Sequence, residues 1–184
     1  VLFRSRPFIE SITMDQQGAD MIAKAIKFAA KAHEGQVRKY TGEPYVTHPL
    51  AVMKLVQEVP HTTEMLAAAL LHDVVEDTPI ELDEIETEFG PVVSALVEGL
   101  TDVSKPEDGN RRTRKSIDRD RLAEQSGEVQ TIKLADLIHN TYSIEEHDPS
   151  FYKVYKQEKM DLLTVLTKGD LTLMWRAQQQ IGGQ

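Results

Sequence analysis

Hydrophobic residues recur along this chain at helical spacing, and no run alternates steadily between hydrophobic and polar positions. In residues 18–33, for example, Ile22, Ile26 and Ala29 repeat every three or four positions, as they would on one side of an α-helix. A half-buried strand would show a period of two instead. The pattern therefore predicts an all-α fold.

Glycine and proline divide the chain into roughly eight to ten helices. We expect helices at residues 18–33, 48–58, 63–77, 81–89, 91–100, 111–125, 128–144, 150–167 and 171–181. The segments 35–47 and 102–110 hold Gly and Pro and are expected to be loops, and the other connections are short. A length of 184 residues suits one domain, so we expect residues 1–184 to form a single domain with residues 1–15 peripheral or disordered.

The helix expected at residues 63–77 changes character towards its end. Its sequence has no polar side chain from Leu66 to Leu71, and His72, Asp73, Glu76 and Asp77 then follow within two turns. Burying ionisable groups is costly unless something compensates, and a metal ion would compensate. A solvated helix end explains the cluster less well, because carboxylates are unfavourable near a helix C-terminus. We interpret the stretch as a metal or catalytic site in which His72 and Asp73 bind one ion together.

Composition narrows the function classes. A net charge of −9 and a pI of about 5.2 argue against non-specific binding to nucleic acid or to anionic membranes. The chain has no cysteine, which excludes disulfides and thiol chemistry and fits a reducing compartment, so we expect a cytoplasmic protein. We expect no membrane span and no signal peptide, because no apolar run is long enough for either.

A second candidate stretch is the expected loop at residues 35–47 and the helix start that follows it. The loop contains two adjacent cations, Arg38 and Lys39, between Gly35 and Gly42, and His48 opens the next helix. Taken alone, His48 is more simply explained as a surface histidine or a helix N-cap. This stretch indicates a functional site only when it is considered together with the other two candidate stretches.

A third candidate stretch lies in the helix expected at residues 128–144. Lys133, Asp136 and Asn140 are spaced i, i+3 and i+7, so they share one helix face, while Ile132 and Ile138 can face the core. By itself, Asp136 is equally well explained as an exposed carboxylate paired with Lys133. Both explanations stay open on spacing alone.

Together the three stretches contain a His, then His-Asp, then a distant Asp. This order resembles the HD phosphohydrolase superfamily, and within it the hydrolase domain of the RelA/SpoT-type alarmone enzymes. The matching phrases are AHEGQVRKYTGEPYVTHP, AALLHDVVEDT, FGPVVSALVEGLT and IKLADLIHNT, and they cover about residues 20–145. The resemblance implies an HD-domain helical bundle. Because the chain stops where such long enzymes begin their synthetase domain, it looks like a small stand-alone alarmone hydrolase.

The resemblance also implies a role for each matching residue. Four side chains would hold one divalent ion, Mn²⁺ in the family: His48, His72, Asp73 and Asp136. Two carboxylates would orient and deprotonate the attacking water: Glu76 and Asp77. Five residues would contact the substrate: Arg38, Lys39, Tyr45, Asn140 and Ser143. The ligand set of two His and two Asp does not by itself choose among Mn, Fe, Co and Zn.

The implied reaction removes the 3′-pyrophosphate of ppGpp or pppGpp and gives GDP or GTP and pyrophosphate, so the implied partner is a guanine nucleotide. Two alternatives stay open. One is an HD phosphohydrolase of another nucleotide, such as a nucleoside monophosphate or NADPH. The other is a catalytically silent nucleotide-binding module, against which the intact ligand set argues. The sequence leaves a homo-oligomer open as well.

Two smaller expectations concern residues outside these motifs. In the basic helix at residues 111–121, Arg111, Lys115 and Arg119 share a face, and this face either contacts the substrate or lies in solvent. We expect His139 to be a buried histidine that packs near the site rather than a ligand. Trp175 is expected to pack inside the bundle.

Overall fold

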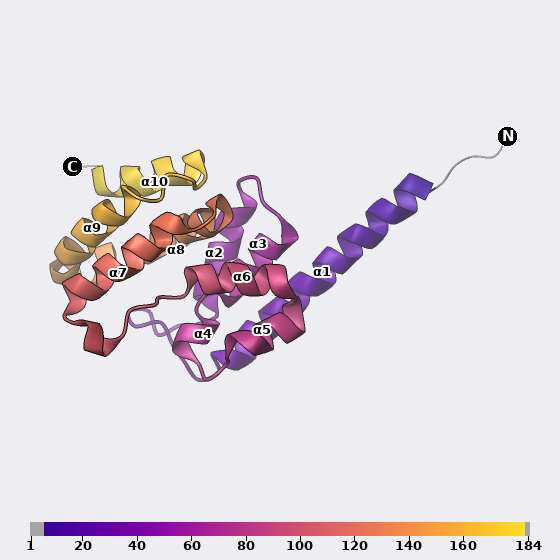
Figure 1. Cartoon of the computed structure of the whole chain (residues 1–184), viewed down its shortest axis with the longest axis horizontal. Helices are drawn as coiled ribbons and strands as arrows, with labels where there is room; N and C mark the ends of the chain where they lie inside the picture. Colours follow the sequence, from indigo (N-terminus) through magenta and orange to yellow (C-terminus); the bar gives the residue numbers. More distant parts are fainter. Residues whose placement is uncertain (1–5, 183–184) are drawn as a thin grey trace.

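The computed structural model describes residues 6–182, with side chains from residue 16 onward, and shows helices joined by short connections (Figure 1). Within this range no strand occurs, and Val37 and Pro44 form an isolated antiparallel bridge. The predicted all-α class is confirmed. The elements are α1 Arg6–Ala32, α2 Thr47–Gln57, α3 Thr63–Leu71, α4 Val74–Asp77, α5 Leu82–Phe89, α6 Pro91–Leu100, the 3-10 helix η1 Pro106–Asp108, α7 Arg111–Glu124, α8 Gly127–His147, α9 Pro149–Leu163 and α10 Leu171–Gly182.

Helix α8 packs against α2, α3, α6, α9 and α10, and so connects most of the bundle. Helix α3 lies in the core beside α1, α2 and α6. Residues 65–71 of α3 are all buried, because this helix offers only Met, Leu and Ala side chains there. On α8, Ile132, Ala135 and Ile138 are fully buried, as predicted, and the opposite positions are left for polar side chains.

Side-chain caps fix where several helices begin. Thr62 caps α3 by accepting a hydrogen bond from the Met65 N–H, and Asp148 caps α9 through the Phe151 N–H. Asn110 and Ser126 cap α7 and α8 in the same way. These caps set the ends of the helices that carry the candidate site.

The prediction of one continuous helix over residues 63–77 is wrong, because the helix is interrupted. Helix α3 ends at Leu71, and α4 begins only at Val74. The Nδ1 atom of His72 lies 2.8 Å from the carbonyl oxygen of Ala69, which is the acceptor that the Asp73 N–H would use in a continuous helix. Asp73 has φ −96° and ψ −5°, at the edge of the right-handed helical region. His72 and Asp73 therefore lie at the break between the two helices.

Other boundaries differ by a few residues or more. Helix α1 begins at Arg6 rather than at residue 18, and its N-terminal part projects from the bundle in Figure 1. Of the residues expected to be peripheral or disordered, 1–15, the first five lie outside the described residues. Helix α8 extends to His147, and α9 ends at Leu163. The assignment of the whole chain to one domain stays a prediction.

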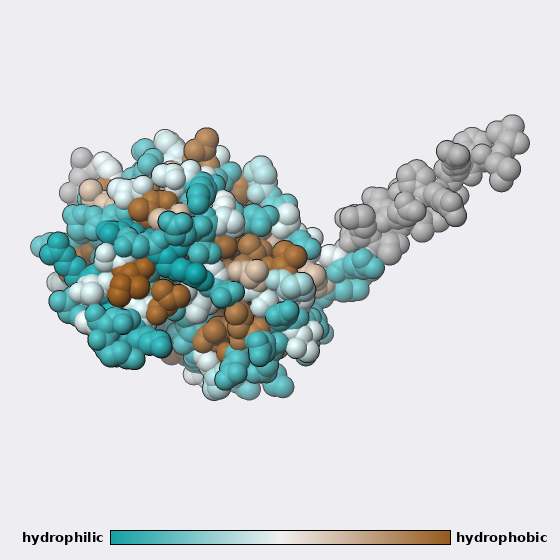
Figure 2. Space-filling model, viewed as in Figure 1, coloured by the Kyte–Doolittle hydropathy of each residue, from teal (hydrophilic) through white to brown (hydrophobic). Residues whose placement is uncertain are grey.

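The described surface is mainly hydrophilic on the face that Figure 2 shows, with separate hydrophobic patches. Trp175 is 60% exposed, so the expectation that it packs inside the bundle is wrong. It lies on α10, which packs mainly on α8 and α9. Among the described residues, no helix is both long enough and apolar enough to cross a membrane.

Candidate metal centre

Side chains from three separate segments converge at the break between α3 and α4. His48 comes from α2, His72 and Asp73 from the break, and Asp136 from α8. The Nε2 atom of His48 lies 3.1 Å from Oδ1 of Asp136 and 3.6 Å from Oδ2 of Asp73. The Nε2 atom of His72 lies 3.0 Å from Oδ2 of Asp73 and 3.7 Å from Oδ1 of Asp136. Two imidazole nitrogens and two carboxylate oxygens thus face one small space.

The chemistry of this cluster fits a divalent metal ion. His48 is 1% exposed and His72 is 4% exposed. The Nε2 atom of His72 is buried without a hydrogen-bond partner, which is rare for a buried polar atom unless an ion or water satisfies it. Its Nδ1 atom is held by the Ala69 carbonyl, so that the lone pair of Nε2 is left for a ligand. His48, His72 and Asp73 present donor atoms that lie within 4.8 Å of one another.

His139 supports His48 from behind. Its Nδ1 atom lies 2.7 Å from Nδ1 of His48, so one ring donates to the other and the Nε2 atom of His48 stays directed at the carboxylates. Burial, the neighbouring His48 and Arg38 lower the pKa of His139 to about 4, which keeps it neutral. His139 thus packs beside the site, although it is half-buried rather than buried as expected.

Asp136 is 5% exposed, so the alternative of an exposed carboxylate does not hold. Lys133 donates to its Oδ2 at 2.8 Å and Asn140 donates to its Oδ1 at 2.7 Å. Burial alone would raise the pKa of Asp136, but the Lys133 ammonium and the two imidazoles outweigh it and hold that pKa well below the usual range. The three residues share one face of α8, as the spacing predicted, and Asp136 is held in its charged form.

Glu76 and Asp77 lie on the single turn of α4, next to the cluster. Oε1 of Glu76 accepts a hydrogen bond from the Asp102 N–H at 2.6 Å. Desolvation and the Asp102 carboxylate raise the pKa of Glu76 to about 7. Desolvation and Asp73 raise the pKa of Asp77 as well. Both groups are therefore better proton acceptors near neutral pH than an ordinary carboxylate is.

Residues 36–45 form a tight hairpin, here called the strap, which reaches from the cluster to α8. The Arg38 N–H donates to the Glu43 carbonyl at 2.8 Å, and the Tyr45 N–H donates to the Gln36 carbonyl at 2.9 Å. The Tyr45 hydroxyl donates to Oδ2 of Asp73 at 2.6 Å. Arg38 donates to Oδ1 of Asn140 at 3.0 Å. The strap thus ties two predicted substrate residues directly to the ligand cluster and to α8.

The HD domain family model matches residues 25–169, most of the chain. This chain belongs to the HD domain family. Its matched range includes α2, α3, α4 and α8, and hence every side chain of the cluster.

Proteins similar to this HD domain include larger bacterial enzymes. A GTP pyrophosphokinase of Streptomyces coelicolor is 38% identical over 154 residues, which are 83% of this chain and 17% of the relative. The bifunctional (p)ppGpp synthase/hydrolase SpoT of Escherichia coli is 33% identical over 168 residues, which are 90% of this chain and 24% of the relative. The chain therefore spans about a fifth of the length of these relatives.

A solved structure of similar size exists for a metazoan ortholog of SpoT that hydrolyzes ppGpp. It matches with a TM-score of 0.79 and 28% identity, covering 88% of this chain and 94% of that one. A Listeria monocytogenes protein, lmo0812, matches with a TM-score of 0.63 at 24% identity, covering 77% of this chain and 96% of that one. This second likeness concerns the fold alone.

Two hollows of the HD domain meet near the cluster. The smaller, of about 300 Å³, lies between the strap and the α8–α9 junction and is here called the strap hollow. All five residues predicted to contact the substrate line it: Arg38, Lys39, Tyr45, Asn140 and Ser143. The larger, of about 1010 Å³, is here called the basic cavity, and helices α7, α8 and α9 line most of it. Asn140 lines both, and Asp136 lines the basic cavity.

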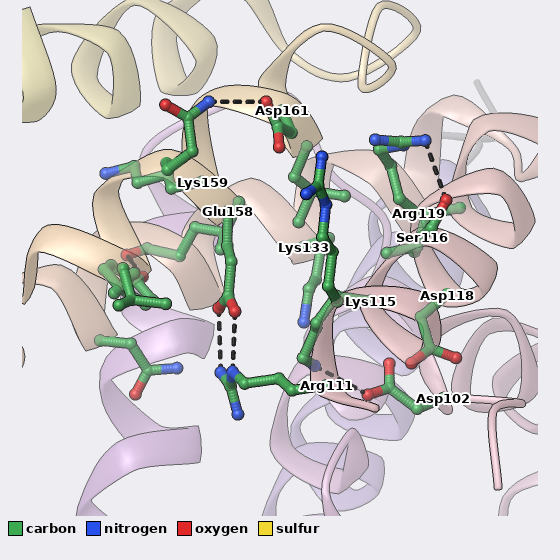
Figure 3. Close-up of a pocket in the computed structure, with 18 of the residues that line it drawn as sticks. Asp102, Arg111, Lys115, Ser116, Asp118, Arg119, Lys133, Glu158, Lys159 and Asp161 are labelled. Atoms are coloured by element: carbon green, nitrogen blue, oxygen red, sulfur yellow. Dashed lines mark hydrogen bonds and ion pairs between the residues drawn. The ribbon is translucent and has the colours of Figure 1, made fainter. Parts of the chain in front are cut away.

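Figure 3 shows Arg111, Lys115 and Arg119 of α7 among the side chains that line the basic cavity. Arg111 donates two hydrogen bonds to the Glu158 carboxylate, at 2.7 and 2.9 Å, and Lys115 lies 3.2 Å from Asp102. Arg119 donates to the Ser116 hydroxyl at 3.1 Å. The face shared by Arg111, Lys115 and Arg119 therefore borders a cavity that Asp136 also borders, rather than open solvent alone.

The sequence analysis missed two acidic residues that organise this region. Asp102 contacts Glu76 through its backbone N–H and Lys115 through its carboxylate. Asp118 is 4% exposed and accepts hydrogen bonds from the Val103 and Ser104 N–H groups and from the Ser104 hydroxyl. A carboxylate among the cations of a basic helix was the available signal for Asp118. No feature of the sequence around Asp102 indicated a role for it in the site.

Proposed function

We propose that this chain is a metal-dependent phosphohydrolase that removes the 3′-pyrophosphate of ppGpp or pppGpp. The observation that carries the proposal is the convergence of His48, His72, Asp73 and Asp136 inside an HD domain. The similarity to a metazoan SpoT ortholog that hydrolyzes ppGpp, over 94% of that chain, supports the choice of substrate. A protein of this kind would act in the cytoplasm, where guanine nucleotides and a reducing environment coincide.

In this proposal the four side chains hold one divalent ion, Mn²⁺ in first place. Two imidazoles and two carboxylates suit several first-row metals, and the low pKa of Asp136 favours ligation because no proton has to be displaced. When bound, the ion polarises phosphoryl oxygens and lowers the pKa of a water molecule from 15.7 towards about 7. The remaining chemistry falls to the residues of the chain.

Asp77 and Glu76 serve as the proton acceptors. The oxygen of a water molecule bonds to the phosphorus that carries the 3′-oxygen, and the bond from that phosphorus to the 3′-oxygen breaks. One water proton passes to the carboxylate of Asp77 or Glu76, and a proton returns from that carboxyl group to the departing 3′-oxygen, so the nucleotide leaves as GDP or GTP with a free 3′-hydroxyl and pyrophosphate is the second product. The raised pKa of both carboxylates brings them closer to the value that suits proton transfer at neutral pH.

Cations stabilise the charge that develops on the phosphoryl oxygens. Arg38 and Lys39 supply this positive charge from the strap, and Lys133 supplies it from α8 beside Asp136. With a net charge of −9 the protein as a whole repels an anionic nucleotide, so the local positive charge is what brings the substrate in. Asn140, which borders both hollows, is placed to contact the nucleotide where the two hollows meet.

The direct test is to incubate Mn²⁺-loaded protein with ppGpp and to quantify GDP and pyrophosphate by chromatography. GTP, a nucleoside monophosphate and NADPH are tested in parallel, with chelator-treated protein as the blank. We expect ppGpp to be cleaved in preference. Turnover of another nucleotide while ppGpp stays intact would refute the substrate, and a protein without bound metal or turnover would instead be a silent binding module.

A further inference from the structure

The strap is anchored at both ends. At its base, Gln36 donates to the backbone carbonyl of Asp77 at 2.9 Å, and the Tyr45 hydroxyl donates to Asp73. At its tip, the Tyr40 hydroxyl donates to Oδ2 of Asp148 at 2.9 Å. Arg38 and Lys39 lie between the two anchors, so the conformation of the strap decides where these cations are held.

Tyr40 makes the tip contact with more than its hydroxyl group. Its ring stacks on the imidazole of His147 at the end of α8, with ring centroids 5.9 Å apart and an interplanar angle of 19°. Lys39 donates to the Tyr40 hydroxyl at 3.3 Å and lies 3.8 Å from Asp148. The tip of the strap is thereby held against the junction of α8 and α9.

Asp148 is a well-fixed acceptor for this contact. It is both the C-cap residue of α8 and the N-cap residue of α9. Its Oδ1 accepts a hydrogen bond from the Phe151 N–H at 3.1 Å, and its Oδ2 accepts one from the Tyr40 hydroxyl. The Phe151 N–H and then the Tyr40 hydroxyl lower the pKa of Asp148, so it stays ionised at neutral pH. A hydrogen bond to an ionised acceptor is stronger than one between neutral groups.

We propose that Tyr40 and Asp148 are a positioning pair that closes the strap over the strap hollow and holds Arg38 and Lys39 ready for the substrate. The hollow has the strap on one side and Ser143, Ile144 and Phe151 on the other. Without the tip contact, substrate binding has to order the strap, and that entropy cost weakens binding. Once bound substrate has ordered the strap, Arg38 and Lys39 occupy the same places against the phosphoryl oxygens, and the base contacts of Gln36 and Tyr45 are intact, so the chemical step changes little.

The kinetic part of this inference rests on the proposed function, and the test separates the two. Tyr40→Phe removes only the hydroxyl group. Asp148→Ser keeps the cap of α9, because serine is a good N-cap, but is too short to reach Tyr40. Tyr142→Phe is the matched control, since Tyr142 is 57% exposed on α8 and its side chain makes no hydrogen bond to any other residue that the structure describes. Thermal melts of all variants check that they fold.

Two measurements follow, steady-state kinetics with ppGpp and hydrogen–deuterium exchange of the free proteins. Tyr40→Phe and Asp148→Ser should each raise KM roughly threefold to tenfold, with kcat within about twofold of wild type. The double variant should be no worse than the worse single variant, because both remove the same contact. Amide exchange should accelerate in residues 36–45 of both variants and not in Tyr142→Phe.

A KM of Tyr40→Phe equal to that of the control, or a loss confined to kcat, would overturn the inference, as would additive effects in the double variant. If wild-type protein does not cleave ppGpp at all, the proposed function fails. The hydrogen–deuterium exchange experiment then tests the positioning pair by itself, because it needs no substrate. Unchanged exchange in residues 36–45 of Tyr40→Phe and Asp148→Ser would overturn the positioning pair.

Discussion

The Nε2 atom of His48 lies 3.1 Å from Oδ1 of Asp136, although α2 and α8 carry the two residues far apart in the sequence. The contact exists because α2 and α8 pack side by side and bring both buried side chains to the break between α3 and α4. A buried imidazole and a buried carboxylate at this distance, with two further donors beside them, form the arrangement that the proposed metal site needs.

Removal of one donor should abolish the metal site. We expect His72→Ala and Asp73→Ala to reduce bound metal from about one ion per chain to near zero, because each removes one of four ligands. Elemental analysis after dialysis measures this, and Mn²⁺ should raise the melting temperature of wild type but not of these two variants. Glu86→Gln, an exposed acid on α5, is the control. Full metal content in Asp73→Ala would contradict the assignment.

Asp77 should matter for turnover and not for metal binding. Asp77→Ala removes a proton acceptor beside the cluster, and loss of a general base typically costs on the order of 10²–10⁴ in rate. We expect kcat for ppGpp to fall by this amount while metal content stays at the wild-type level. Parallel kinetics and elemental analysis check both halves. A rate near wild type would show that Asp77 does not activate the water.

Asp118 should hold the connection between α6 and α7. Asp118→Ala removes the acceptor of the Val103 and Ser104 N–H groups, and a hydrogen bond to a charged group contributes roughly 1.5–3 kcal/mol. Urea denaturation should show this loss in the free energy of unfolding. Asp118→Asn keeps an acceptor oxygen and should lose clearly less. Equal losses in the two variants would point to charge rather than hydrogen bonding as the cause.

Lys159 should make stability depend on pH. It is 1% exposed and donates to Thr141 and Gln180, and burial lowers its pKa to about 7. The unfolded chain, with a lysine pKa near 10.4, binds more protons between pH 7 and 10, so the contribution of Lys159 to stability rises with pH across that window.

We therefore expect Lys159→Met to flatten the rise in melting temperature between pH 7 and pH 9. Lys153→Met, on the exposed side of the same helix, should follow the wild-type curve. Thermal melts at closely spaced pH values make the comparison. Identical pH curves for wild type and Lys159→Met would show that folding does not lower the pKa of Lys159.

Local rules predicted much of this fold. The Ala/Leu run of α3 with its Thr62 cap, and the spacing of Lys133, Asp136 and Asn140, each depend on residues within a few turns of one another. The break after Leu71 could not be predicted in this way, because helix propensity favours continuing and the competing contact is made by a side chain, His72.

Contacts between segments far apart in the sequence could not be predicted either. The hydrogen bond from Tyr40 to Asp148 depends on how the strap lies over the α8–α9 junction, which no periodicity encodes. The exposure of Trp175 depends on which side of α10 the rest of the chain covers. Residue spacing alone left open whether His48 and Asp136 bind a metal. Only the order of the three motifs along the chain, which resembles a known family, predicted that they share one site.

The most direct measurement of the central claim is anomalous diffraction at the manganese edge from crystals grown with Mn²⁺. The account predicts one strong peak within about 2–2.5 Å of Nε2 of His48, Nε2 of His72 and one oxygen each of Asp73 and Asp136. No peak among these four side chains, or a peak held by other residues, would contradict it.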